Sequence, residues 1–155
     1  MDDPVAKSFD KGRVYAVGQS GVMVAIDLRT GSRLWEVPVA GIHEPWVAGD
    51  FLYAVSIDSE AICVDARTGR IVWVTQLPAF GNEKRKKNRI VWAGPALASD
   101  RLILVGSNGE ALSLSPYSGE VLGKVELDSS ASLTPVFANS TMYLLDDDGQ
   151  LAAYR

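Results

Sequence analysis

The chain has 155 residues, 47% apolar and 22% charged, which suits one ordinary domain with a buried core. Its net charge of −4 disfavours nucleic acid or an anionic membrane as the main partner, because both demand a basic surface. No apolar run reaches the roughly 18 residues that a membrane-spanning helix needs, and no basic, apolar secretion signal follows Met1. The single cysteine, Cys63, cannot form an internal disulfide and is expected to be a buried structural thiol.

Short apolar segments bounded by turn residues recur along the chain in four groups, and each segment predicts a strand. The first group has segments at 3–6, 14–17 and 23–27 and a strand ending near Trp35. The second has 44–47, 52–55 and 61–65 and a strand ending near Trp73. The third has 94–97, 102–105 and 111–115 and a strand ending near Gly123. The fourth has 134–137, 142–145 and 151–155.

One motif sets the register of these groups. The frame Ala-x-Asp-x-x-Thr-Gly-x-x-x-Trp occupies 25–35, returns at 63–73 with cysteine in its first place, and returns in decayed form at 113–123. A period near 40 residues built from short strands and glycine turns is typical of a repeat architecture. Several of the strands are apolar throughout, which indicates that both faces of each small sheet are covered.

These observations predict an all-β chain with almost no helix, built as a β-propeller of about four four-stranded antiparallel blades. The expected blades span 3–37, 42–76, 92–127 and 131–155, with an insert loop at 79–91. The fourth blade is expected to lack its outer strand. Uncovered faces at the two ends of the stack would expose apolar side chains to water, and such faces favour association or aggregation. We therefore expect either that two copies pair into an eight-bladed ring or that another set of blades lies upstream.

No set of residues in the sequence supports catalysis. His43 is the only histidine, so neither a metal cluster nor a catalytic triad follows from it. The run Asp146-Asp147-Asp148-Gly149 falls on a predicted hairpin turn and lacks the alternating ligands of a calcium loop. No nucleophile elbow or phosphate-binding loop is present. We expect no enzyme activity, no catalytic or metal site and no cofactor.

The insert at 79–91 is the best candidate for a partner contact, with a plain solvated loop as the alternative. It is the one departure from the repeat period, and functional loops often grow on rigid scaffolds. It places four consecutive basic residues on an acidic chain. The candidate contact residues are Phe80, Lys84, Arg85, Lys86, Lys87 and Arg89.

The Asp-x-x-Thr-Gly-x-x-x-Trp frame resembles the tryptophan-docking motif of pyrroloquinoline-quinone-type propellers. The resemblance implies a structural role, in which Asp and Thr satisfy turn amides, Gly allows a positive φ, and Trp packs between blades. The residues concerned are Asp27, Thr30, Gly31 and Trp35 in the first copy and Asp65, Thr68, Gly69 and Trp73 in the second. The third copy lacks both Asp and Trp, so weaker stacking or another side chain is expected there.

Finer details resemble the BamB family, namely the segments 45–50, 69–78, 92–95 and 144–155. This resemblance implies the C-terminal half of an eight-bladed lipoprotein of the outer-membrane β-barrel assembly machinery, located in the periplasm on the inner face of the outer membrane. It implies a non-catalytic scaffold that docks on the periplasmic domains of BamA and helps unfolded barrel precursors to insert. Two alternatives stay open: a generic quinoprotein-like repeat module for protein contact, and a fragment of a quinone-dependent dehydrogenase.

Overall fold

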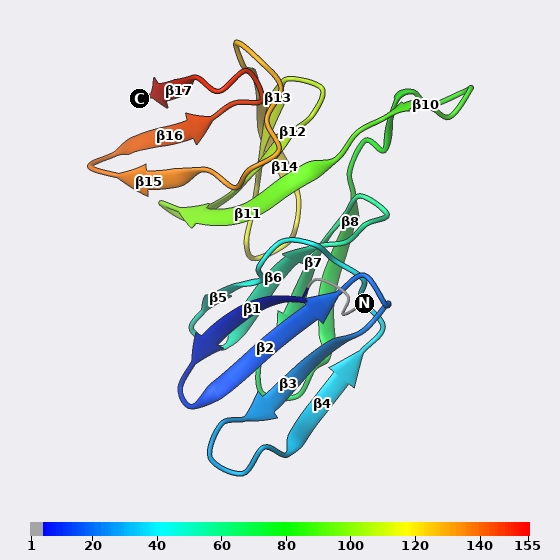
Figure 1. Cartoon of the computed structure of the whole chain (residues 1–155), viewed down its shortest axis with the longest axis vertical. Helices are drawn as coiled ribbons and strands as arrows, with labels where there is room; N and C mark the ends of the chain where they lie inside the picture. Colours follow the sequence, from blue (N-terminus) through cyan, green and yellow to red (C-terminus); the bar gives the residue numbers. More distant parts are fainter. Residues whose placement is uncertain (1–4) are drawn as a thin grey trace.

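The computed structural model describes residues 5–155, and this part of the chain consists of strands and turns with no helix (Figure 1). Of the strand expected at 3–6, Asp3 and Pro4 lie outside the described residues. The strand that the structure describes in this place is β1 (Val5–Asp10).

Four antiparallel sheets follow one another along the chain, and we call them blades 1 to 4. Blade 1 consists of β1, β2 (Arg13–Gly18), β3 (Met23–Asp27) and β4 (Arg33–Val37). Blade 2 consists of β5 (Trp46–Ala48), β6 (Phe51–Val55), β7 (Glu60–Asp65) and β8 (Ile71–Gln76). Blade 3 consists of β11 (Trp92–Ala98), β12 (Arg101–Gly106), β13 (Glu110–Leu114) and β14 (Val121–Glu126). Blade 4 consists of β15 (Val136–Ala138), β16 (Thr141–Leu145) and β17 (Leu151–Tyr154).

Strand order equals chain order in every blade, so each blade is a meander of hairpins. The prediction of an all-β chain with antiparallel four-stranded sheets is confirmed. A fifth, two-stranded sheet pairs β9 (Phe80–Asn82) with β10 (Lys87–Arg89). The insert at 79–91, which was predicted to be a loop, is therefore a hairpin that projects from the blades as an arm (Figure 1).

The core lies between the blades, because the middle strands of blades 2 and 3 bury side chains on both faces. Leu52 and Ala54 of β6 pack in one cluster with Tyr15 and Val17 of blade 1. Their neighbours Tyr53 and Val55, which point the opposite way, pack in a second cluster with Leu102 and Leu104 of blade 3. A smaller third cluster joins blades 3 and 4. Two-sided burial explains the continuous apolar runs in the sequence.

A β-bulge recurs at the same place in blades 1, 2 and 3. The pairing shifts between Ala25 and Ile26, between Cys63 and Val64, and between Ser113 and Leu114. Each shift lies where the third strand meets the outer strand, beside the Thr-Gly or Ser-Gly turn. The repeated motif thus produces a repeated local kink, which orients the start of each outer strand.

Candidate interaction surface

The Asp-x-x-Thr-Gly turn is closed by its own side chains. In blade 1, the Asp27 carboxylate accepts hydrogen bonds from the backbone N–H of Arg29 and of Thr30, both at 2.9 Å. These backbone donors, that of Thr30 first, hold the pKa of Asp27 below its usual value. Gly31 closes the turn at a φ of 71°, a conformation that glycine adopts without strain.

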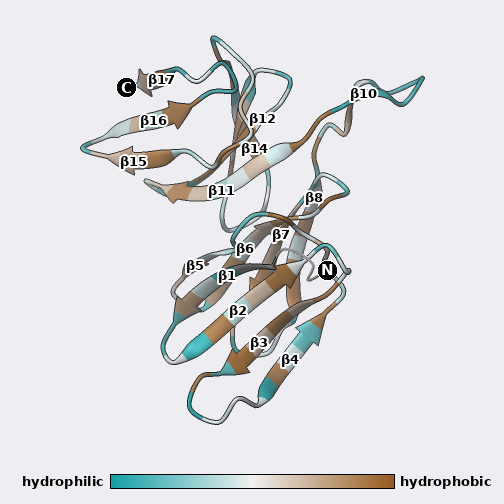
Figure 2. Ribbon diagram, in the orientation of Figure 1, coloured by the Kyte–Doolittle hydropathy of each residue, from teal (hydrophilic) through white to brown (hydrophobic). Residues whose placement is uncertain are grey.

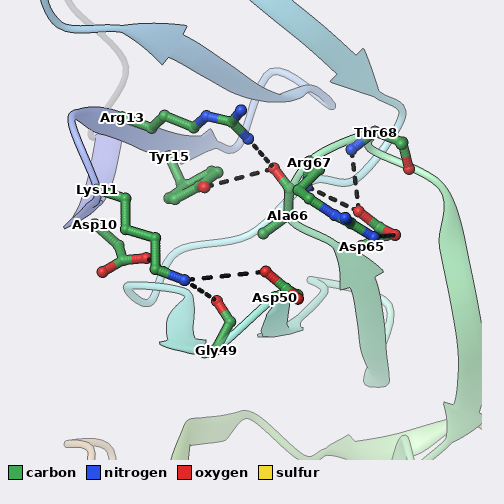
Figure 3. A network of polar contacts seen from close by, with 10 residues as sticks. All are labelled: Asp10, Lys11, Arg13, Tyr15, Gly49, Asp50, Asp65, Ala66, Arg67 and Thr68. Atoms are coloured by element: carbon green, nitrogen blue, oxygen red, sulfur yellow. Dashed lines mark hydrogen bonds and ion pairs between the residues drawn. The ribbon is translucent and has the colours of Figure 1, made fainter.

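Blade 2 repeats this turn in detail. Asp65 accepts from the backbone N–H of Arg67 at 2.8 Å and of Thr68 at 3.1 Å, and Gly69 has a φ of 75°. The pKa of Asp65 is lowered by the same kind of bond, led by Arg67. Figure 3 shows these contacts around Asp65. The structure thus brings together the Asp, Thr and Gly of each motif copy within one turn.

In blades 1 and 2, the motif tryptophan reaches the turn of the next blade. Trp35 Nε1 donates to the Ala66 carbonyl at 3.0 Å, and its ring covers Gly69 so closely that a Cβ there would lie 2.7 Å from Cδ2. Trp73 Nε1 donates to the Pro116 carbonyl at 3.0 Å, and its ring covers Gly119. Each motif therefore acts across a blade boundary: the turn glycine provides the flat surface on which the indole of the preceding blade rests.

Further polar contacts join blades 1 and 2, at the Ala66 carbonyl and at the turn between β5 and β6. Arg13 Nη1 donates to the Ala66 oxygen at 3.1 Å, and the Tyr15 hydroxyl lies 3.5 Å from it (Figure 3). Lys11 Nζ lies 3.5 Å from the Gly49 carbonyl and 3.9 Å from the Asp50 carboxylate. The turn of blade 2 is thus held by several side chains of blade 1, a set that the sequence motif did not reveal.

The boundary between blades 3 and 4 has no docked indole, because Gly123 stands at the tryptophan position. The turn of blade 3, on which Trp73 of blade 2 rests, has Ser115 in place of Asp, and its hydroxyl accepts from the N–H of Tyr117 and of Ser118, both at 3.3 Å. A cavity of about 360 Å³ lies between blades 3 and 4, lined among others by Gly123, Met142 and Tyr154. The missing indole and this cavity distinguish the boundary from the two in which a tryptophan is docked.

The insert at 79–91, which we call the basic arm, is a hairpin whose backbone is held by hydrogen bonds to its own side chains. At its base, Glu83 Oε1 accepts from the backbone N–H of Ala79 and of Phe80, at 3.0 and 3.1 Å. In its turn, Asn82 Oδ1 accepts from the N–H of Arg85 at 3.0 Å. Lys86 and Asn88 adopt positive φ angles, which a tight reversal of the chain requires.

The arm is anchored to the blades by its flanks. Leu77 and Ile90 are 2% and 4% exposed and belong to the core cluster between blades 2 and 3. Arg89 stacks on Phe80, with its guanidinium carbon 5.9 Å from the ring centroid, and donates to the Ile57 carbonyl. Of the six candidate contact residues, Phe80 and Arg89 therefore lie at the base.

The remaining candidates lie at the tip, which is coloured hydrophilic in Figure 2. Lys84, Arg85, Lys86 and Lys87 are all exposed. Within residues 5–155, none of them forms an ion pair with a carboxylate. The arm thus presents a group of unpaired positive charges on an anchored base, which suits an acidic partner surface.

A hollow of about 740 Å³ is lined by residues of β1, β5 and β11 and of the segments that precede β5 and β15. His43 and Trp46 line it, and sequence reasoning assigned them no role in it. Within residues 5–155, His43 Nε2 is buried without a hydrogen-bond partner. Burial lowers the pKa of this imidazole, which favours its neutral form. Only the solitary position of His43 before a strand could have drawn attention to it.

Other titratable groups take part in packing or turns. Burial raises the pKa of the Cys63 thiol to about 12, and Cys63 lies in the core cluster of blades 2 and 3. Asp146 accepts from the backbone N–H of Asp148 and of Gln150 within the blade 4 turn. Among the described residues, no group of three or more His, Cys, Asp or Glu side chains could hold a metal ion. Nor does this part of the chain contain a helix suited to crossing a membrane.

Comparison with known proteins relates these features to a family. A family model described as outer membrane protein assembly factor BamB matches residues 1–75. A BamB of Marinobacter adhaerens is 23% identical over 147 residues, which cover 92% of this chain and 35% of that protein. The chain thus spans about a third of the length of this curated relative.

Solved structures agree on the fold. BamB from Moraxella catarrhalis superposes with a TM-score of 0.74 at 21% identity, covering 97% of this chain and 45% of that one. A quinohemoprotein alcohol dehydrogenase from Pseudomonas putida superposes with a TM-score of 0.73 at 12% identity, covering 93% of this chain and 29% of that one. The chain therefore has the fold of β-propeller blades, and its resemblance to the BamB family is confirmed.

Proposed function

We propose that this chain is a non-catalytic scaffold in the assembly of outer-membrane proteins, which docks on the periplasmic domains of BamA and aids the insertion of β-barrel proteins. The observation that carries the proposal is the stack of packed blades with its anchored basic arm, in a chain similar to proteins named outer membrane protein assembly factor. Its proposed location is the periplasm, on the inner face of the outer membrane.

The arm is the proposed docking element. Its tip carries Lys84, Arg85, Lys86 and Lys87, and the body of the chain is acidic, with a net charge of −4 overall. Uneven charge of this kind orients a protein during encounter, so that the arm approaches an acidic surface first. Because Arg89 stacks on Phe80, the backbone at the base of the arm is held before the arm binds, which lowers the entropy cost of docking.

Unfolded barrel precursors are the second proposed class of partner. Exposed apolar side chains on the outer strands, such as Val74 and Val125, provide contacts of the kind an extended apolar segment can use. A second copy of this chain is the third, because paired copies would complete an eight-bladed ring.

Two other functions compete with the scaffold role. A generic propeller module would bind some protein other than BamA. A quinone-dependent enzyme fragment would bind pyrroloquinoline quinone, and the likeness to a quinohemoprotein alcohol dehydrogenase is at 12% identity, which concerns the fold alone. A visible-absorbance titration with this quinone tests the enzyme alternative, and a saturable spectral change would favour it.

The decisive experiment is a binding titration of the chain against purified periplasmic domains of BamA. We expect saturable binding that weakens as salt rises, because exposed charges are screened. The variant Lys84→Gln/Lys87→Gln should bind at least about tenfold more weakly, which corresponds to about 1.4 kcal/mol.

The matched control is Arg29→Gln/Arg70→Gln, which removes the same charge from the exposed turns of blades 1 and 2. It should bind like the wild-type chain. Equal weakening by both variants would show that net charge and not the arm drives binding. The absence of binding by a folded wild-type chain would contradict docking through these residues.

A further inference from the structure

One face of blade 4 carries an apolar patch. Tyr143, Leu145 and Leu151 are 37%, 44% and 72% exposed. The register pairs Leu145 with Leu151 and Tyr143 with Val136, and residues paired across strands share one face of a sheet. We call these four residues the end face of blade 4.

The same positions make the blade-to-blade contacts elsewhere in the chain. In blade 1, the equivalents of Tyr143, Leu145 and Leu151 are Tyr15, Val17 and Met23, which are 2%, 0% and 0% exposed. In blade 2, the equivalents are Tyr53, Val55 and Ala61, which are 5%, 4% and 3% exposed. In blade 3, the equivalents Val105 and Ala111 are buried and Ile103 is half-buried. The positions of Tyr143, Leu145 and Leu151 thus belong to a surface that is buried against the following blade in blades 1 and 2 and largely so in blade 3.

Blade 1 carries the opposite half of this contact. The residues Val14, Ala16, Val24 and Ile26 lie on its other face and are only partly buried, and we call them the start face of blade 1. The equivalent residues of blades 2 and 3 are all buried. In blade 2 they are Leu52 (0% exposed), Ala54 (2%), Ile62 (3%) and Val64 (0%). In blade 3 they are Leu102 (1%), Leu104 (0%), Leu112 (5%) and Leu114 (0%).

We infer that the end face of blade 4 in one copy packs against the start face of blade 1 in a second copy, and that the reverse contact closes a ring of two copies. The contact repeats one that the chain already makes between blades 1 and 2 and between blades 2 and 3. It covers side chains whose burial removes apolar surface from water. It rests on the proposed pairing of two copies and is independent of docking to BamA.

Ring closure distinguishes this pair from an open filament. A contact between two different faces is heterologous, and it gives either a closed ring or a growing fibre, depending on the angle between copies. The Moraxella catarrhalis propeller, of which this chain covers 45%, is about twice as long as this chain. Two copies therefore match the amount of chain that one propeller of this kind contains.

The test is the mass of the purified chain by sedimentation equilibrium over a wide concentration range. We expect a species of about twice the 16.7 kDa of one copy. Leu145→Glu, on the end face, should give a single-copy mass and retain the strand-rich circular dichroism spectrum. The matched control Val72→Glu changes a residue of β8 that is 46% exposed, against 44% for Leu145, and should keep the paired mass.

A second variant tests the other face. Val24→Glu, on the start face of blade 1, should also abolish pairing, because a heterologous contact needs both faces. Pairing that survives Val24→Glu but not Leu145→Glu would mean that two blade 4 faces meet, and would overturn the inference. A wild-type chain of single-copy mass at every concentration would also overturn it, as would a mass that climbs beyond two copies.

Discussion

The contact between blades 2 and 3 and the contact between blades 3 and 4 use the same sheet faces but differ in how they are filled. Between blades 2 and 3, Trp73 rests on Gly119 and donates to the Pro116 carbonyl, beside a cluster of Tyr53, Leu102 and other large side chains. Between blades 3 and 4, the buried cluster is mostly small: Ala93, Val105, Ala111, Ala131 and Leu144.

This difference distinguishes two interactions that hold neighbouring blades together: packing between the middle strands, and docking of an indole on the next turn. The alternating apolar side chains of the middle strands suffice to pack one blade on the next, since blades 3 and 4 pack without a tryptophan. The indole adds a large apolar area at the outer strand together with one directed hydrogen bond to the next turn. Its effect should therefore appear as stability of the first two boundaries and as a fixed orientation of the outer strands.

The largest effect is expected from removing an indole. Trp73→Ala should lower the free energy of unfolding by roughly 3–5 kcal/mol, through lost burial and the cavity that remains. Thermal and urea denaturation measure this loss. Trp46→Ala, which changes a tryptophan that is 38% exposed and lines the hollow, should cost clearly less. Equal losses in the two variants would show that docking adds nothing beyond ordinary burial.

The turn glycines test the same indole contact from the side of the turn on which the tryptophan rests. Gly31 and Gly69 have φ angles of 71° and 75°, yet a Cβ meets nothing within 4 Å at Gly31 and the Trp35 ring at Gly69. Gly31→Ala should cost about 1–2 kcal/mol, the penalty of a left-handed conformation. Gly69→Ala should cost about 1–3 kcal/mol more, because the indole must shift.

A double-mutant cycle in urea identifies the source of that excess. In a Trp35→Ala background, the extra cost of Gly69→Ala over Gly31→Ala should disappear, since no ring then covers the new methyl group. An excess that persists in this background would place the strain within the turn itself.

A smaller effect is expected from repairing the decayed turn of blade 3. Ser115→Asp would replace a hydroxyl acceptor at 3.3 Å with a carboxylate, as in Asp65, whose bonds are 2.8 and 3.1 Å long. Charge-assisted hydrogen bonds are stronger than neutral ones, so stability should rise by about 0.5 kcal/mol. Ser118→Asp adds the same charge in the same turn. A gain of equal size in that control would attribute the effect to charge alone.

The smallest effect concerns pH and His43. Burial lowers the pKa of His43, so the unfolded chain binds a proton more readily than the folded one. Stability should therefore fall as the pH drops below 6.5, the ordinary value for this side chain. Urea midpoints at pH of about 7.5 and 5.5 should differ less for His43→Gln than for the wild-type chain. Identical differences would show that other groups control this range.

Much of the fold could be predicted from the sequence because its strand pairing is local. Each strand pairs with its neighbour in the chain through a short turn, so hydrophobic runs and turn residues, such as Gly12 and Gly109, mark nearly every hairpin. The frame around Thr30-Gly31 and Thr68-Gly69 also indicated the tight turns. The structure of the insert was harder to predict. Its positive charge was evident, but its hairpin depends on hydrogen bonds that the Glu83 carboxylate and the Asn82 amide oxygen accept from backbone N–H groups.

Contacts between blades were only partly predictable. The motif indicated that Trp35 packs between blades, yet its partner, the Ala66 carbonyl, lies in the next repeat and also accepts from Arg13. Likewise, the sequence shows that Tyr15 and Tyr143 occupy equivalent positions but not that one is buried and the other exposed. Such differences depend on whether a neighbouring blade covers the face, which no local pattern records.

The sequence by itself determined the repeat, the blade-type sheets and the family resemblance, because these follow from short-range pairing and from residue types at fixed spacing. Only the tertiary structure decided which carbonyl each indole reaches, how the basic arm is held, and which apolar faces of blades 1 and 4 are left uncovered. The physical reason is that burial and directed hydrogen bonds between blades belong to pairs of segments, whereas the sequence describes one segment at a time.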